Sequence, residues 1–194
     1  MSIKQFIGSH KMTVLLDNGV NRHLRFSDDG GEKTNHWFDL VTFDEGLVIQ
    51  SGFGSYSFSK RYVADMFEFF RGRESDSAYI LEKVTSKSHD TVVFSEDLAK
   101  QYIIDCFEFW LDAGDLGDDA KRKMYDEFLD GLSEDEFVCE RDAYDEYREF
   151  RFNGHLIKFD FDDFAPYKPS ARYIDCVEAI KWGIGEYDKS KGAA

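Results

Sequence analysis

The chain has 194 residues, of which 42% are hydrophobic and 16% aromatic, and its formal net charge is −15. This apolar content excludes an intrinsically disordered chain in spite of the charge. The excess of carboxylates lies in the C-terminal half, where it disfavours direct binding to DNA or RNA phosphates and to anionic membranes, whereas it suits basic proteins, including those that hold nucleic acid. Composition alone favours the simpler explanation, that the charge keeps the protein in solution.

Antiparallel sheet is predicted for the first part of the chain. Two strand-like runs flank Asn18-Gly19, and two more flank Asp44-Glu45-Gly46, which are both hairpin signals. A further alternating run, GFGSYSFS, brings the predicted meander to about five strands, close to the usual size of a sheet.

The apolar residues then change to helical spacing. In YVADMFEFFRGR, one face carries Val63, Met66, Phe67 and Phe70. We expect this helix to cover the sheet, so that residues 1–74 form a sheet with a packed helix. Residues 75–94 combine loop signals with an ambiguous AYILEKV run, and they are predicted to be a connector.

The remainder, residues 95–194, is predicted to be a mainly helical, acidic part with one short hairpin. Residues 105–149 alone carry 17 acidic and five basic side chains. The hairpin is expected around Asn153-Gly154, and the chain closes with the helical pattern ARYIDCVEAIKWGIGEYD. These patterns predict an α+β fold, with an N-terminal antiparallel β-meander packed by a helix and a helical part after it. One continuous domain is the alternative, because no clear linker separates the parts.

Three acidic helices are predicted between residues 95 and 150. The first begins at a Ser95 cap, the second spans residues 118–132, and the third begins at Ser133, where S-E-D-E is a capping box. Their apolar residues and their carboxylates fall on different faces. We define the acidic ridge as the carboxylates that these helices and the first connecting loop are expected to display: Asp105, Glu108, Asp112, Asp115, Asp135, Asp142, Asp145, Glu146 and Glu149.

The cysteines and termini indicate a reducing compartment. Cys106, Cys139 and Cys176 are far apart, form no C-x-x-C motif and fall within helical patterns, so we expect buried, reduced thiols. The N-terminus has no signal-peptide pattern, and no segment approaches the ~18 apolar residues of a membrane span. We therefore expect a soluble, cytoplasmic protein without a membrane partner.

No catalytic motif names a reaction. The five histidines have no metal-binding spacing, the Gly52 and Gly54 pair lacks a phosphate-loop lysine, and residues 112–119 do not match a calcium loop. Three aspartates, Asp160, Asp162 and Asp163, resemble half of a magnesium site, and a metal-dependent enzyme is one alternative. Such a site needs further acidic residues and a lysine that converge on it. We therefore expect a protein without catalysis, cofactor or bound metal.

Both ends of the chain resemble an uncharacterised protein family of tailed phages and prophages of enteric bacteria. The start of that family is similar, in order, to HKMTVLLDNGVNRHLRF, HWFDLVTFDEGLVI, GFGSYSFS and DMFEFFRGR, and its C-terminal helix is similar to YIDCVEAIKWGIGEYDK. The acidic middle is more divergent. These motifs are aromatic and structural, so the resemblance transfers no site residue. It implies a phage-encoded accessory protein of the bacterial cytoplasm.

The acidic ridge and this resemblance together suggest an anti-defence role. Carboxylates at +3, +4 and +7 recur every roughly 5 to 10 Å along a helix, which suits a basic groove built for nucleic acid. We expect a DNA-mimic-like inhibitor of a host nucleic-acid-binding complex, such as a CRISPR effector or a restriction enzyme. The alternative without catalysis is an interaction or scaffold module that binds through the aromatic N-terminal sheet. Core packing and a homodimer interface both account for the aromatic residues.

Overall fold

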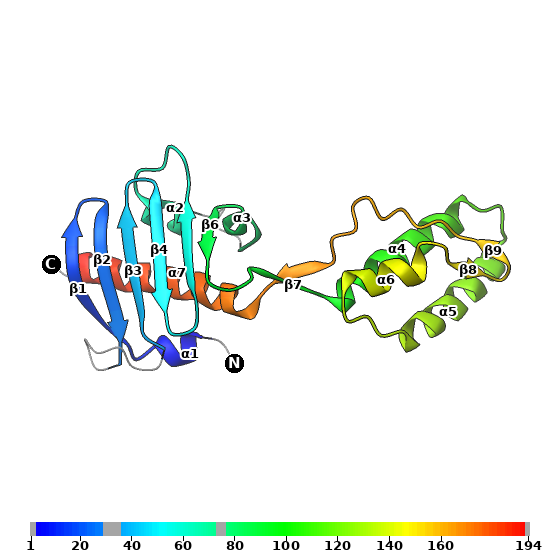
Figure 1. The fold of residues 1–194 in the computed structure, drawn as a ribbon, viewed down its shortest axis with the longest axis horizontal. Helices are drawn as coiled ribbons and strands as arrows, with labels where there is room; N and C mark the ends of the chain where they lie inside the picture. Colours follow the sequence, from blue (N-terminus) through cyan, green and yellow to red (C-terminus); the bar gives the residue numbers. More distant parts are fainter. Residues whose placement is uncertain (1–2, 29–35, 73–76, 193–194) are drawn as a thin grey trace. The chain divides into compact units, whose positions relative to one another are not determined.

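The computed structural model describes residues 3–28, 36–72 and 77–192, with the backbone alone for residues 77 and 78. The chain divides into two compact units (Figure 1). We call residues 1–92 and 169–194 the sheet unit, and residues 93–168 the acidic unit. The fold is of the α+β class, as the sequence patterns predict.

The sheet unit is built on six antiparallel strands that follow one another in chain order. Hairpin turns connect the first strand to the second and the third strand to the fourth, as expected from Asn18-Gly19 and the turn at residues 44–46. The sixth strand lies within residues 75–94, which the sequence patterns predict to be a connector. This segment therefore contributes a strand to the sheet. The strands are β1 (Lys11–Asn18), β2 (Asn21–Ser27), β3 (Phe38–Phe43), β4 (Gly46–Ser51), β5 (Ser55–Ser59) and β6 (Val84–Lys87).

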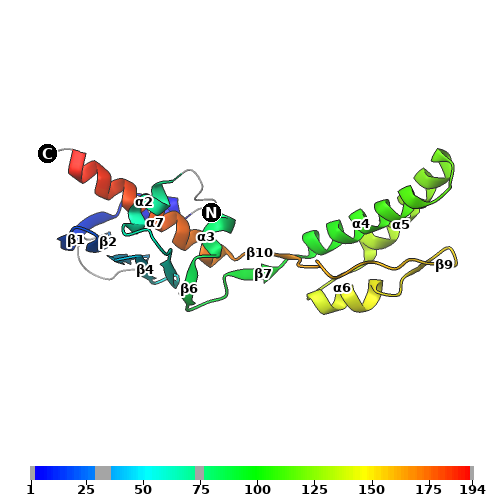
Figure 2. The same ribbon diagram turned by 90° about the horizontal axis from the view of Figure 1, so that it is seen from above.

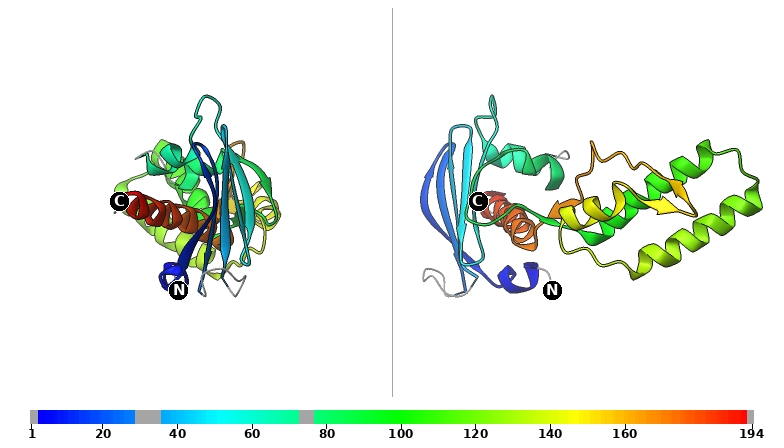
Figure 3. Two further views of the ribbon diagram at one scale, coloured as in Figure 1. Left: turned by 90° about the vertical axis from the view of Figure 1, so that its left-hand side faces the viewer. Right: turned by 45° about the vertical axis from the view of Figure 1, so that its right-hand side comes forward.

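Helices cover one face of this sheet. The long helix α7 (Ala171–Gly192) contacts β1, β3, β4 and β5, and both α1 (Lys4–Ile7) and α2 (Met66–Arg71) pack against it (Figure 2; Figure 3, right). The helix α3 (Ser77–Leu81) follows α2. Alternate strand residues point to this face and form the core, because successive side chains of a strand project to opposite sides.

The close approach of α7 to the sheet depends on a glycine. A Cβ built at Gly183 would lie 2.9 Å from Leu40 Cδ1 and 3.1 Å from the ring of Phe26. The rings of Phe26 and Phe38 stack with centroids 4.6 Å apart beneath the helix. The sequence patterns group α7 with the acidic helices because it follows them, whereas the structure places it in the sheet unit, where its apolar stripe finds the aromatic face of the sheet.

The acidic unit is a second, separate core of helices and one short hairpin. Helices α4 (Glu96–Ala113) and α5 (Asp118–Glu134) form an antiparallel pair joined by a short loop, and α6 (Glu140–Tyr147) packs against α4 (Figure 3). The predicted hairpin forms, with β8 (Arg151–Phe152) and β9 (His155–Leu156). Where the chain enters and leaves the unit, β7 (Val92–Phe94) pairs with β10 (Tyr167–Pro169).

The third acidic helix begins later than predicted. Helix α5 continues to Glu134, and the hydroxyl of Ser133 donates to the carbonyl of Asp130 at 2.7 Å instead of capping a new helix. The capping role passes to Asp142, whose carboxylate accepts the N–H groups of Val138 and Cys139 at 2.9 and 3.1 Å. Residues that suit a helix start occur both at Ser133 and at residues 139–142. Because α5 packs against α4 as far as its last turn, the helix continues through Ser133 and the new helix begins at the second position.

The three thiols differ in burial. Cys176 is buried, as expected, whereas Cys106 is half-buried and Cys139 is exposed at the start of α6. No helix among the described residues is long and apolar enough to cross a membrane.

Candidate protein-binding surface

Almost all of the net negative charge of the chain lies in the acidic unit. Residues 93–168 carry 22 acidic and nine basic side chains, for a net charge of −13, whereas the sheet unit carries 17 and 15, for a net charge of −2. The excess of carboxylates over cations is therefore concentrated in the acidic unit.

Helix α4 displays one stripe of carboxylates. Its buried residues recur at every fourth position, and Asp105, Glu108 and Asp112 lie on the opposite side, all exposed. Asp97 begins the same stripe about two turns before Asp105. The three carboxylates predicted for the first acidic helix are thus displayed together. Asp115 is also exposed, in the loop that follows the helix.

Helix α5 carries a second stripe that the sequence prediction missed. Its buried residues, Phe128 and Leu132, face the core, and five exposed carboxylates with one lysine occupy the opposite side. The signal was present, since these acids also recur at +3 and +4 spacing in DDAKRKMYDEFLDGLSE. The carboxylates of the α5 stripe are Asp119, Asp126, Glu127, Asp130 and Glu134.

Aromatic packing holds the two stripes in fixed positions. Phe107 of α4 and Phe128 of α5 are stacked, with ring centroids 3.8 Å apart and planes within 9° of parallel. The hydroxyl of Tyr125 on α5 donates to Glu108 on α4 at 2.7 Å, so the pKa of Tyr125 is raised by this hydrogen bond and by burial. The carboxylates are therefore mounted on a rigid helical pair.

Several of the carboxylates predicted for the third helix have partners within the acidic unit. Asp142 caps α6, and the backbone N–H groups that it accepts hold the pKa of its carboxyl below the ordinary value. Asp145 pairs with Arg141 at 3.2 Å, and Glu149 lies 3.7 Å from Arg148. Glu146 is exposed. Pairs of this exposed kind stabilise a protein by about 0–1 kcal/mol and partly offset the local negative charge.

Asp135 turns away from the predicted ridge. It ends α5, and its carboxylate accepts a hydrogen bond of 2.5 Å from the hydroxyl of buried Tyr147. Burial and this hydrogen bond raise the pKa of Tyr147. Asp135 and Asp142 of the predicted ridge therefore make structural contacts within the unit. The residues of the ridge that form an uninterrupted stripe are those on α4.

The three aspartates of the predicted half-site for magnesium do not converge on a cation. Asp160 Oδ1 accepts the N–H of Asp162 at 3.0 Å, which is a local turn, and Asp163 lines a different groove. Among the residues that the structure describes, no three His, Cys, Asp or Glu side chains lie close enough to hold a metal ion.

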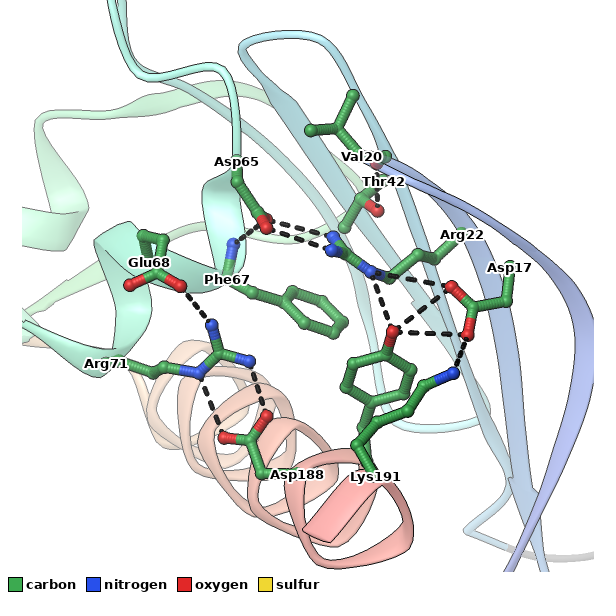
Figure 4. A network of polar contacts seen from close by, with 11 residues as sticks. Asp17, Val20, Arg22, Thr42, Asp65, Phe67, Glu68, Arg71, Asp188 and Lys191 are labelled. Carbon is green, nitrogen blue, oxygen red and sulfur yellow. Dashed lines mark hydrogen bonds and ion pairs between the residues drawn. The ribbon is translucent and has the colours of Figure 1, made fainter. Parts of the chain in front are cut away.

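The sheet unit contains the other concentration of charged side chains, around Arg22 (Figure 4). Its guanidinium donates to both oxygens of Asp65 at 2.9 Å, and its Nε donates to the hydroxyl of Tyr187 at 3.3 Å. That hydroxyl and Lys191 also contact Asp17, which joins β1 and the end of α7 to β2. Asp65 in addition caps α2 by accepting the N–H of Phe67 at 2.9 Å.

Every charged group of this cluster has a partner within the unit, so we interpret it as a structural clamp. The same holds for Asp39, which accepts hydrogen bonds from Arg25 and His23 on the sheet. The largest aromatic residues of the sheet are also buried under the helices, including Phe26, Phe38, Tyr56 and Phe58. A scaffold module that binds through this aromatic face would first have to uncover it.

Comparison with protein families, with curated protein sequences and with solved structures gives no match for this chain.

Proposed function

We propose that the acidic unit is a decoy for nucleic acid, which occupies the binding groove of a basic host protein without catalysis. The observation that carries the proposal is the pair of carboxylate stripes on α4 and α5, fixed by the stacked rings of Phe107 and Phe128. The resemblance to a phage family supports an anti-defence role, with a CRISPR effector or a restriction enzyme as the target.

The physical basis is the spacing and rigidity of the charges. A helix rises about 1.5 Å per residue, so carboxylates at +3 and +4 recur at intervals of about 5–6 Å, in a row that a line of arginines or lysines can follow. A rigid array loses little conformational entropy when it binds, in contrast to a flexible acidic tail. Its long-range attraction speeds association and weakens with salt.

The contact surface that we propose differs from the predicted ridge. Asp105, Glu108 and Asp112 remain at its centre, and the α5 stripe joins them. The carboxylates of α6 contribute less, because Asp142 caps its helix and Asp145 pairs with Arg141. The surface is therefore the outer side of α4 and α5.

Capture from bacterial lysate on immobilised protein tests the proposal. The test variant carries Asp126→Asn, Asp130→Asn and Glu134→Gln, and the matched control carries Asp145→Asn, Glu146→Gln and Glu149→Gln on α6. Both remove three exposed charges. We expect the wild type and the control to retain a nucleic-acid-handling protein that duplex DNA or guide RNA displaces, and the α5 variant to lose it.

Two results would contradict the proposal. One is the retention of no basic nucleic-acid-handling protein at low salt. The other is retention that both triple variants preserve equally and that nucleic acid does not displace, because the carboxylates of α5 would then be only a solvated face.

A further inference from the structure

The turn between β5 and α2 holds a tyrosine in a backbone conformation that tyrosine rarely adopts. The N–H of Val63 donates to the carbonyl of Lys60 at 3.2 Å, which closes a β-turn, and Tyr62 is its third residue with φ of 67°. Glycine or asparagine normally occupies such a position, because a bulky side chain is crowded there. The turn therefore carries strain that the residue type does not relieve.

Glu45, in the neighbouring β3–β4 turn, holds the strained turn in place. Its carboxylate accepts the N–H of Tyr62 at 2.7 Å, and its carbonyl accepts the N–H of Lys60 at 3.2 Å. Its own N–H donates to the carbonyl of Ala64 at 3.4 Å. Glu45 itself has φ of 57°. Two adjacent turns are thus braced against each other, and the position of Tyr62 is fixed in advance.

Burial does not compensate for this strain. The side chain of Tyr62 is 83% exposed, and the guanidinium of Arg61 lies 4.9 Å from the centroid of its ring. Strained backbone that brings no packing is typical of sites that contact another molecule. Tyrosine and arginine are also the residue types most enriched at the energetic centres of interfaces. The braced turn is therefore a candidate plug, which we define as Arg61 and Tyr62.

The charges around the plug favour a protein partner over nucleic acid. Lys60 and Arg61 are balanced by Asp44 and Glu45 in the adjoining turn, so no excess of cations is present for a phosphate backbone. A suitable partner groove has an apolar wall for the phenol ring and carboxylates for the guanidinium.

The acidic unit of this chain offers such a groove. It lies between α4 and the segment 163–166 and has a volume of about 240 Å³, which suits one aromatic side chain. Its lining includes two carboxylates, Asp105 and Asp163, and no basic residue. Leu98, which is 43% exposed, and Ala165, which is also exposed, form its apolar wall.

We propose that the Arg61–Tyr62 plug of one copy docks into this groove on a second copy of the chain. The ring of Tyr62 packs against Leu98 and Ala165, and Arg61 pairs with Asp105 and Asp163. Two copies that exchange plugs reciprocally form a closed dimer, whereas one-way docking forms an open chain. If the proposed decoy function holds, self-association also covers Asp105 and competes with the host partner at α4.

Sedimentation velocity of the full chain, from micromolar to millimolar concentration, tests the proposal. We expect concentration-dependent association that Tyr62→Asn weakens at least about tenfold, as for loss of a central interface residue. Asparagine tolerates the φ of the turn, so a melting temperature at or above that of the wild type shows that this variant is folded. The matched control is Phe109→Ala, since this aromatic side chain is 78% exposed on α4 outside the groove and its loss leaves association unchanged.

Exchanging the charges of Arg61 and Asp163 tests whether these two side chains pair across the proposed contact. Arg61→Glu weakens association, Asp163→Arg weakens it as well, and the double variant regains most of the wild-type affinity, because the pair is restored with reversed sign. The proposal is overturned if the wild type stays monomeric at every concentration, if Tyr62→Asn associates as strongly as the wild type, or if the double variant is no better than the single ones. Capture of the host partner by a chain that stays monomeric leaves the decoy function intact.

Discussion

The two units of this protein both have aromatic cores, but they differ in how their charged side chains are paired. The sheet unit pairs its charges internally: Arg22, Asp65 and Asp17 satisfy one another, and its net charge is close to neutral. The acidic unit also stacks its aromatic side chains, yet its carboxylates outnumber its cations by 13. Charges that neighbours already satisfy stabilise a fold, whereas charges fixed in place without partners are available to another molecule.

The largest expected effect separates the two cores. Phe107→Ala removes a fully buried ring that stacks on Phe128, and we expect the acidic unit to lose about 3–5 kcal/mol of its free energy of unfolding. The sheet unit has its own core and keeps its stability. Amide hydrogen exchange that is resolved by residue measures both units at once. Phe109→Ala, at an exposed position on the same helix, is the control, and equal loss in both units would show that they unfold as one.

The second effect falls on the sheet unit alone. Arg22→Met leaves Asp65 and Asp17 without their buried cation, and we expect a loss of about 2–4 kcal/mol, because removing one member of a buried ion pair leaves an uncompensated charge. Thermal unfolding that is followed through the tryptophans of each unit detects it. The control is Arg61→Met, on an exposed arginine. A loss equal to that of the control would mean that water already screens the clamp.

Acid should destabilise the sheet unit before the acidic unit. Burial opposes the ionisation of Asp65 and Asp39, but hydrogen bonds from Arg22 and Arg25 outweigh it, so the pKa of each carboxyl lies below its ordinary value. Their contribution is therefore complete above about pH 4, the ordinary value, and is lost as the pH falls through the lowered pKa. In the acidic unit the pKa of Asp142 is also lowered, but protonation of the many other exposed carboxylates relieves their mutual repulsion.

Hydrogen exchange measured from neutral pH down to about pH 3 compares the two units across this window. We expect the protection of the sheet unit to fall first, and Asp65→Asn to reduce its pH dependence, leaving the part due to Asp39, at some cost in stability at neutral pH. Simultaneous loss in both units would contradict the assignment of the lowered pKa values to the clamp.

The smallest expected effect concerns an exposed turn of the sheet unit. Tyr62→Asn replaces a strained residue by one that tolerates positive φ, and we expect a gain of about 0.5–1.5 kcal/mol in the stability of the sheet unit. Differential scanning calorimetry measures the shift in melting temperature. Tyr62→Phe, which keeps the strain and the ring, should leave the melting temperature unchanged. A loss of stability in the asparagine variant would mean that the ring contributes to the fold.

Local patterns predicted several elements because their causes are local. The hairpin at Asn18-Gly19 and the stripe of Asp105, Glu108 and Asp112 follow from turn chemistry and from helical spacing. The same spacing occurs on α5, whose acidic residues are not part of the predicted ridge. The start of the third helix was misplaced because Ser133 and Asp142 both suit a cap, and only one of them ends up at a helix start.

The sequence by itself determined that this protein has an antiparallel sheet, amphipathic acidic helices and a surplus of carboxylates in its second half, because side-chain periodicity and charge are properties of neighbouring residues. Only the tertiary structure decided that α7 belongs to the sheet, that Asp135 turns inward to Tyr147, and that Glu45 holds Tyr62 at positive φ. Each of these depends on a partner from a distant element or a neighbouring turn, and no local pattern specifies which partner a side chain will meet.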